Sequence, residues 1–544
     1  MLKNIWHKYL YLILFFIIAN SLYFLANIPF ISRIQSVTAG NIPTYQHHGV
    51  VMDYLNYITF IRESAGGAWR LPDLHTTEPT SKNGNMFYFI LLGKLSKITG
   101  LSPTATYHLT RIVEFQIFVF ILFVFLVLLL GKSAGFWAAI LSIITSPPYS
   151  LFGKTIYGRG DLGIPAWWML TPYRRVDMIP PHAASIILLL LEILFIARIM
   201  KACPFKNALI AGILAFFSTM FHPASGLFFI FAHALVLVLI YLKQLLRKKH
   251  PPVSPYVYLL IPALFSGLAI LFQRYEVTST YPFNQWLYFD VIWYDRYEYY
   301  VRDFFIGGGP ILVFGGFLAL VTLLASDNPV WLLISVWALL TYAIMPISTQ
   351  LGVAKFRLAL LLPYIPLSVL YTKWIKECWR RKKQSPFLIA IAITTIIILS
   401  GVTLPSMPVM YKDWAMQAGN IEPGMSYSHN WADAINFLSN HIPPYSYILS
   451  GEINGILIPS RVRAVVYVGQ YLETIDFEAK KELVRLFFGG LLSDTEARKL
   501  IYKNRIKYIF YGNQEKSWGP GPKAYSLSTS IVFQNPEVTI YEVK

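Results

Sequence analysis

About eleven apolar runs divide the sequence, and Lys and Arg are concentrated in nearly every second segment that connects them. An apolar run of about 20 residues crosses a lipid bilayer as a helix, and basic residues stay in the cytoplasmic loops. The pattern therefore predicts a multi-pass membrane protein. It also accounts for the net charge of +18, because the basic residues lie beside apolar runs. These residues form no basic stripe on a polar domain, so we expect no nucleic-acid partner.

The predicted spans cover about residues 10–30, 112–130, 134–152, 183–199, 207–220, 226–241, 256–271, 311–325, 330–347, 357–371 and 387–404. Because their number is odd, the two ends of the chain are expected on opposite sides of the membrane. Lys3 and Lys8 predict a cytoplasmic N-terminus, and the basic clusters at 243–249 and 373–383 predict two cytoplasmic loops. The expected location is a cell membrane, with the C-terminal region external or periplasmic.

The expected fold class is mainly α, a polytopic transmembrane helical bundle of about 11 spans with a small external α/β C-terminal domain. We expect one domain at residues 1–404, with a first external loop at 31–111, and a second at 405–544. In the second domain, the spacing of apolar residues predicts helices at 431–441 and 477–488, and strands at 464–468, 467–474, 506–511 and 538–543. This domain is expected to cover a site or guide an acceptor, without a catalytic centre of its own.

The first external loop carries one acidic residue at the start of a predicted amphipathic helix. Met52, Leu55, Ile58 and Ile61 recur at helical spacing, and Asp53 lies on another face of the same helix. A second amphipathic helix is predicted at 85–98, where Gly100 ends it and Ser102-Pro103 starts the next span. The loop is therefore expected to form two surface helices, the first of which bears an aspartate.

In these features the chain resembles the GT-C superfamily of membrane glycosyltransferases, which take sugars from polyprenyl-phosphate donors. The resemblance covers the whole plan of spans, surface helices and external C-terminal domain. Its local marks are Asp53, the segment 87–95 leading to 99–103, and Lys355-Phe356-Arg357 before 362–366. Many members have paired acids in the first loop, whereas Asp53 has no acid beside it here, so no cofactor is certain and a divalent metal stays open.

Transfer from a lipid-linked sugar with inversion needs a base that takes a proton from the acceptor hydroxyl. Asp53 is the expected catalytic base, and the alternative is that it caps its helix or pairs with a basic residue. Glu63 and Asp73 are secondary acidic candidates. Glu78 is expected to contact the acceptor or the sugar.

The donor phosphate needs cations near the outer ends of spans. Lys355 and Arg357 are the expected phosphate-binding residues, and they point to the same side only if the chain there is extended. His222 and His182, at the outer ends of other spans, join this expected site. The alternative for the two cations is contact with lipid head groups.

The external segment at 153–181 combines acids, tryptophans and arginines. Sugars stack on aromatic rings, and carboxylates accept hydrogen bonds from sugar hydroxyls, so Asp161, Trp167 and Arg174 are expected to contact the acceptor or the sugar. Interfacial tryptophans are also common at membrane edges for structural reasons. The aromatic loop at 281–300 allows the same two interpretations.

The sequence contains no GxxxxGK[ST] phosphate loop, HExxH motif or GxSxG motif, so ATP-driven chemistry is not expected. The preferred function is a membrane glycosyltransferase of the cell envelope that transfers a sugar from a polyprenyl-phosphate donor to a lipid, glycan or protein acceptor, in contact with membrane lipids. The alternatives are a polysaccharide or lipid transporter and a noncatalytic assembly factor.

The charge pattern yields a test of topology. Reporter fusions after residue 382 should be active only as cytoplasmic reporters, and fusions at residue 544 only as external ones, because basic loops stay inside. The reverse result at both positions would contradict the predicted orientation.

Overall fold

The structure is a computed structural model of the whole chain, and it describes residues 2–38, 40–47, 50–146, 171–199, 204–247, 256–286, 301–350 and 353–544. These residues divide into two compact units. The membrane unit comprises Met1–Ile28, Thr110–Gln273 and Tyr288–Met416, and the loop–tail unit comprises Pro29–Leu109, Arg274–Leu287 and Gln417–Lys544.

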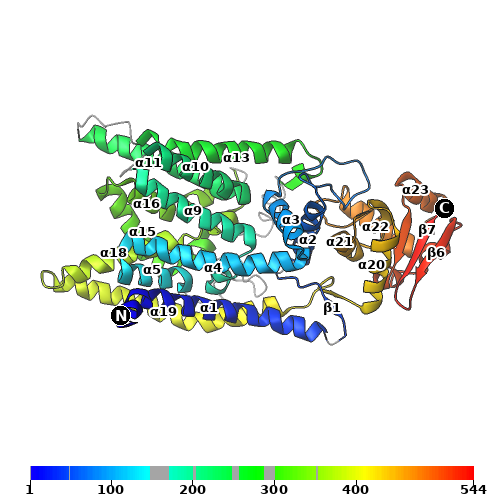
Figure 1. Cartoon of the computed structure of the whole chain (residues 1–544), viewed down its shortest axis with the longest axis horizontal. Coiled ribbons are helices and arrows are strands. Elements are labelled where there is room, and N and C mark those ends of the chain that lie inside the picture. The colour runs from blue at the N-terminus through cyan, green and yellow to red at the C-terminus, as the bar shows by residue number, and fades with distance from the viewer. Residues whose placement is uncertain are drawn as a thin grey trace. The chain divides into compact units, whose positions relative to one another are not determined.

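Long apolar helices account for most of the membrane unit (Figure 1). Within the described residues, nine helices are long and apolar enough to span a membrane. The helices with residues in this unit are α1 (Leu2–Thr38), α4 (Pro103–Leu130), α5 (Lys132–Ile144), α8 (Pro172–Val176), α9 (Pro180–Ile199), α10 (Pro204–Phe221), α11 (Pro223–Leu246), α13 (Leu260–Thr278), α15 (Val301–Ala325), α16 (Pro329–Ile344), η2 (Met345–Ile347), α17 (Lys355–Ala359), α18 (Tyr364–Arg380) and α19 (Pro386–Gly419). All eleven predicted apolar runs overlap helices, with residues 147–152 of the run at 134–152 outside the described residues, and the predicted fold class is confirmed. The domain boundary predicted between residues 404 and 405 stays a prediction, and it falls inside α19.

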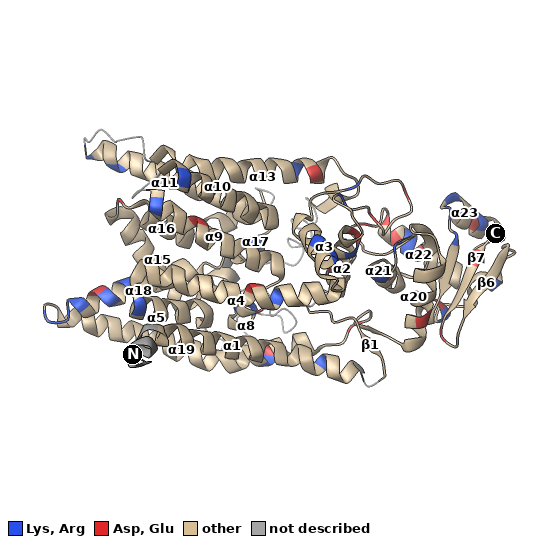
Figure 2. Cartoon of the chain, in the orientation of Figure 1, with Lys and Arg blue, Asp and Glu red and all other residues tan. Residues whose placement is uncertain are grey.

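The predicted span at 357–371 is wrong as one continuous helix. The chain forms the short α17, leaves the helical conformation at Leu362 with φ 48°, and begins α18 after Pro363. Proline disfavours a helical residue before it, which explains the break. Lys373, Lys376 and Arg380, expected in a loop, lie on α18, and Figure 2 shows basic residues toward the end of this helix.

Polar side chains join neighbouring helices of the membrane unit. Helices α9 and α10 lie side by side (Figure 1), and the Ser185 and Ser218 hydroxyls are 2.9 Å apart. Each hydroxyl also donates to the backbone carbonyl of the other residue. Such bonds between helices satisfy polar groups that lipid cannot satisfy, and they fix α9 against α10.

The loop–tail unit contains the two helices α2 and α3 and an α/β region. Strands β3 (Ser446–Leu449), β4 (Ala464–Val466), β5 (Tyr508–Tyr511), β6 (Thr529–Gln534) and β7 (Thr539–Val543) form one sheet in the order β4-β3-β5-β7-β6. Strand β3 is parallel to β4 and β5, whereas β7 is antiparallel to β5 and β6. The other elements are β1 (Ile42–Pro43), α2 (Val51–Ala65), α3 (Phe87–Thr99), η1 (Phe283–Gln285), β2 (Ser426–Tyr427), α20 (His429–His441), α21 (Glu452–Arg461), α22 (Phe477–Phe488), α23 (Asp494–Lys503), α24 (Asn513–Lys516) and η3 (Gly521–Ala524).

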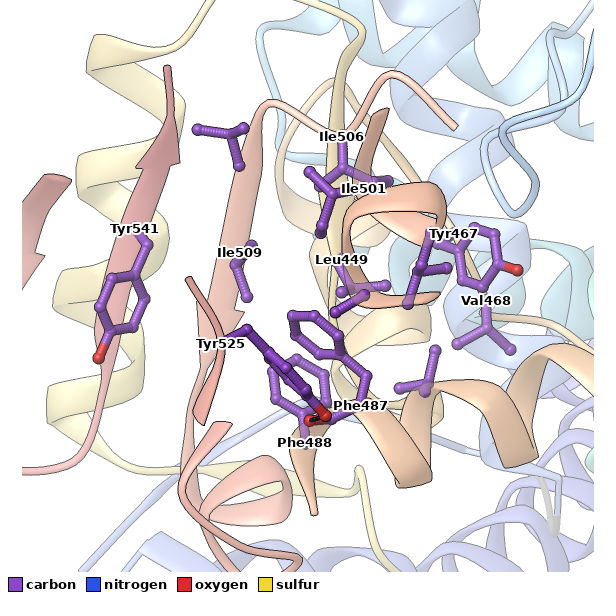
Figure 3. Close-up of a cluster of buried hydrophobic side chains, with 14 residues drawn as sticks. Leu449, Tyr467, Val468, Phe487, Phe488, Ile501, Ile506, Ile509, Tyr525 and Tyr541 are labelled. Carbon is purple, nitrogen blue, oxygen red and sulfur yellow. Dashed lines mark hydrogen bonds between the residues drawn. The ribbon is translucent and has the colours of Figure 1, made fainter. Parts of the chain in front are cut away.

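A hydrophobic cluster holds the sheet against α22 and α23 (Figure 3). Phe487 and Phe488 of α22 are fully buried, and the ring of Tyr525 stacks on Phe487 with centroids 5.0 Å apart. The predicted helices at 431–441 and 477–488 correspond to α20 and α22. The predicted strand at 467–474 is wrong, because Tyr467–Thr474 forms turns instead, in which the Gln470 side chain accepts hydrogen bonds from the backbone N–H groups of Leu472 and Glu473.

Candidate functional site

Asp53 lies in the first turn of α2, as the sequence predicts. Leu55, Ile58 and Ile61 are at most 1% exposed, so the apolar face of the helix is packed while Asp53 is half-buried. Val50, and not Asp53, occupies the N-cap position. An acid in the first turn is favoured by the partial positive charge of the helix N-terminus.

A second acid, Glu473, lies beside the face of α2 that carries Asp53. The Asn56 side-chain amide donates a hydrogen bond of 2.5 Å to Glu473 Oε1. Since Asn56 follows Asp53 by three residues, the two side chains lie on the same face of α2. The charge of Asp53 also acts on Glu473 directly. The segment after β4 therefore brings a carboxyl group to Asp53.

Glu473 belongs to a buried acid cluster, which we define as Asp73, His75 and Glu473, each at most 5% exposed. The backbone N–H of His75 donates to Asp73 Oδ1 at 2.8 Å, and His75 Nε2 lies 4.0 Å from Glu473 Oε2. The Thr474 hydroxyl donates to the His75 carbonyl. A Cβ at Gly469 would come within 2.4 Å of His75 Nδ1, so this close approach requires glycine.

Burial controls protonation in this cluster. Burial raises the pKa of Glu473 well above its usual range, and the nearby charges of Asp73 and Asp53 raise it further. Burial also raises the pKa of Asp73, whereas it lowers the pKa of His75 to about 3. At neutral pH the imidazole is therefore neutral and the buried carboxyl groups tend to keep their protons.

Glu78, predicted to contact acceptor or sugar, forms an ion pair in the structure. Lys480 Nζ donates to Glu78 Oε2 at 2.5 Å and to the Thr76 hydroxyl at 2.8 Å. Lys480 is 5% exposed, and its ammonium lies 4.8 Å from the centre of the Tyr467 ring. Burial alone would raise the pKa of Glu78, but the hydrogen bonds from Lys480 and Thr76 outweigh it and lower that pKa. This pair fastens the chain segment between α1 and α4 to α22.

Three of the predicted phosphate-binding residues come together in the membrane unit. The rings of His182, on α9, and His222, the N-cap residue of α11, lie 4.8 Å apart. Ser185 follows His182 by three residues and Ser218 precedes His222 by four, so the serine pair joins the two chain segments that carry the histidines. His222 Nδ1 is 2.6 Å from the Ser225 hydroxyl, and within the described part of the chain its Nε2 has no hydrogen-bond partner.

Arg357, on α17, is close enough to His222 for its charge to act on the imidazole, and α17 packs against α11. Lys355 and Arg357 both lie in α17, so the chain here is helical and not extended, which was the condition for the two side chains to share a side. Side chains of residues that are two positions apart on a helix point in directions about 200° apart around the helix axis. Lys355 and Arg357 therefore do not project to the same side.

Arg174, predicted to contact the acceptor, is 9% exposed and lies 4.4 Å from the centre of the Trp414 ring. Its neighbour Asp177 accepts hydrogen bonds from Arg111 at 2.8 Å and from Asn27 at 3.3 Å. Sequence analysis missed this buried pair, because Arg111 and Asp177 are 66 residues apart and no local pattern links them.

The remaining predicted site residues, Asp161 and Trp167, lie outside the described residues, as does the aromatic segment 287–300. Asp53 and Glu78 belong to the loop–tail unit, whereas His182, His222, Lys355, Arg357 and Arg174 belong to the membrane unit. Among the residues that the structure describes, no group of three or more His, Cys, Asp and Glu side chains is arranged to hold a metal ion.

Comparisons with known proteins bear on the fold. No protein-family model matches the sequence, and no curated protein matches it. Among solved structures, the chain is similar to the apo form of the Archaeoglobus fulgidus oligosaccharyltransferase, with 12% identity and a TM-score of 0.50 over 99% of this chain and 75% of that one. It is also similar to ArnT from Cupriavidus metallidurans bound to undecaprenyl phosphate, with 12% identity and a TM-score of 0.49 over 98% of both chains.

Both of these proteins are GT-C membrane glycosyltransferases. At 12% identity, the match to the oligosaccharyltransferase shows a shared fold. The chain therefore has the GT-C fold, as the resemblance of its sequence predicts.

The ion pair of Glu78 and Lys480 yields a test of its structural role. Glu78→Gln and Lys480→Met should each lower the melting temperature, because each leaves a polar group without its ionic partner; the loss should amount to about 1–3 kcal/mol of unfolding free energy. The double variant should lose less than the sum of the two single variants. Additive losses, or a normal melting temperature in Glu78→Gln, would contradict the pairing and favour acceptor contact instead.

Proposed function

We propose that this chain is a glycosyltransferase that transfers a sugar from a polyprenyl-phosphate donor to an acceptor on the external face of the membrane. The observation that carries the proposal is Asp53, an acid in the first turn of the first surface helix of a chain with the GT-C fold. The similar oligosaccharyltransferase is, by its name, an enzyme that transfers saccharides. The carboxylate, the fold and the surface helix together support this chemistry.

In the proposed reaction, Asp53 takes the proton of the acceptor hydroxyl as the acceptor oxygen bonds to the anomeric carbon. The bond from that carbon to the phosphate oxygen breaks, and its electron pair leaves with the lipid phosphate. Attack from the side opposite the phosphate inverts the anomeric centre. The energy of transfer comes from the activated donor.

The donor phosphate is proposed to bind near Arg357, His182 and His222. The guanidinium supplies charge-assisted hydrogen bonds, and His222 Nε2 supplies a further polar contact. The N-terminus of α11, where His222 is the N-cap residue, adds a favourable partial positive charge. Acceptor contacts by Glu78, Asp161, Trp167 and Arg174 stay predictions, and the acceptor class, whether lipid, glycan or protein, stays open with them.

Asp53→Asn should abolish transfer while the protein still folds, because asparagine keeps the shape of the side chain but is not a base. Loss of a general base costs a factor of about 10² to 10⁴ in rate. The assay is turnover of a polyprenyl-phosphate sugar by purified protein in lipid nanodiscs, with Asp433→Asn, an exposed acid on α20, as the matched control.

Near-normal turnover of Asp53→Asn would remove the catalytic role of this residue. Absence of transfer by the unmodified protein would favour the two alternatives, a lipid or polysaccharide transporter and a noncatalytic assembly factor, since neither needs a base.

Arg357→Gln should weaken donor binding by about 10- to 100-fold, because a charge-assisted hydrogen bond contributes roughly 1.5–3 kcal/mol. Lys355→Gln is the matched control, and its effect should be much smaller because the two side chains diverge on α17. Binding of the lipid donor to nanodisc-embedded protein measures both.

Asp53→Asn should keep its affinity for the donor, which separates binding from chemistry. Equal losses in Lys355→Gln and Arg357→Gln would show that both cations hold the phosphate. Normal binding by Arg357→Gln would place the phosphate elsewhere.

A further inference from the structure

The C-terminal region supplies an ionisable group to the vicinity of Asp53. Asn56 and Glu473 are 417 residues apart along the chain, yet their side chains share a hydrogen bond of 2.5 Å. Because Asn56 lies one turn after Asp53, Glu473 faces the part of α2 that carries the proposed base. Both segments belong to the loop–tail unit, so this juxtaposition is a property of one compact body.

The surroundings of the two acids differ. Asp53 is half-buried in the first turn of α2, where the helix N-terminus favours a negative charge. Glu473 is 1% exposed and lies against Asp73 and His75. Two neighbouring carboxyl groups resist ionising together, and the more buried of them keeps its proton.

Two cations act electrostatically on the cluster, Arg62 on His75 and Lys480 on Asp73, and each has an acidic partner of its own. Arg62, on α2, pairs with Glu63 at 2.7 Å, and Lys480, on α22, pairs with Glu78. His75 is held neutral by burial. The Asn56 amide donates to Oε1 of Glu473, so a proton on this carboxyl group belongs on Oε2.

We propose that Glu473 is a positioning residue for Asp53: it holds a proton beside Asp53 and so leaves Asp53 as the ionised member of the pair. This inference rests on the proposed function, in which Asp53 is the base. It makes the C-terminal region part of the machinery of transfer, because Asp53 then depends on a proton that this region carries.

The arrangement has a consequence for alkaline pH. As pH rises through the raised pKa of Glu473, a second negative charge appears next to Asp53. This charge repels the neighbouring carboxylates Asp53 and Asp73, and so displaces Asp53 from the position in which it acts as the base. Transfer should therefore decline on the alkaline side as Glu473 loses its proton.

The first test measures the proton directly. Infrared spectra of the full chain in nanodiscs at pH 7 should contain a carbonyl band of a protonated carboxyl group that Glu473→Gln removes. Asp433→Asn should keep it, and Asp73→Asn controls for a band from the other acid of the buried acid cluster. An unchanged band in Glu473→Gln would overturn the proposal, and this readout does not depend on transfer activity.

The second test measures the pH profile of kcat/KM. Glu473→Gln keeps an acceptor for the Asn56 amide but cannot ionise, so its ratio of activity at pH 9 to activity at pH 7 should exceed that of the unmodified protein by at least about threefold. A purely structural role would lower activity by the same factor at every pH, and that result would overturn the proposal. If the unmodified protein transfers no sugar, the proposed function fails, whereas the infrared test still decides where the proton is.

Discussion

A polar group in hydrocarbon has no water to bond with, and this constraint governs the membrane unit. Each unpaired backbone N–H or carbonyl in a bilayer costs several kcal/mol, so the apolar segments have to be helices. Polar side chains in these helices have to find partners as well. Ser185 pairs with Ser218, and Arg111 pairs with Asp177 and Asn27. These pairs decide which helices are neighbours, since uniform apolar surfaces would pack in many ways.

The same constraint accounts for the proposed donor site. His182 and His222 meet because the serine pair holds α9 against α10, and α11 begins directly after His222. Arg357 approaches because Pro363 ends α17 early, and the Trp337 indole N–H donates to the carbonyl of Leu361 near that break at 3.0 Å. A continuous span through residues 357–371 would have presented these residues differently.

In the loop–tail unit the governing interaction is the burial of charge. Lys480, Glu473 and Asp73 are nearly inaccessible to water, and each takes part in contacts between the segment that joins α1 to α4 and the C-terminal region. Burying such groups costs several kcal/mol unless they are paired or neutral. Lys480 is stabilised by its ion pair with Glu78, whereas Glu473 avoids a buried charge by keeping its proton. Both residues hold the same segment of the chain, Lys480 as a charged group and Glu473 as a neutral one.

Much of the fold was determined by the sequence alone. Apolar runs of membrane length predict the spans, and the spacing of Leu55, Ile58 and Ile61 predicts α2, because these signals come from residues that are neighbours along the chain. Local patterns also predict β4, β5 and β7, whereas β3 and β6 were not predicted. Asp53 is found in the same way. The tertiary structure alone decided which distant groups meet it: the hydrogen bond from Asn56 to Glu473 spans 417 residues, and the approach of Arg357 to His222 depends on a helix break and a packed helix pair. Contacts of this kind follow from packing and desolvation in three dimensions, which no local pattern of residues encodes.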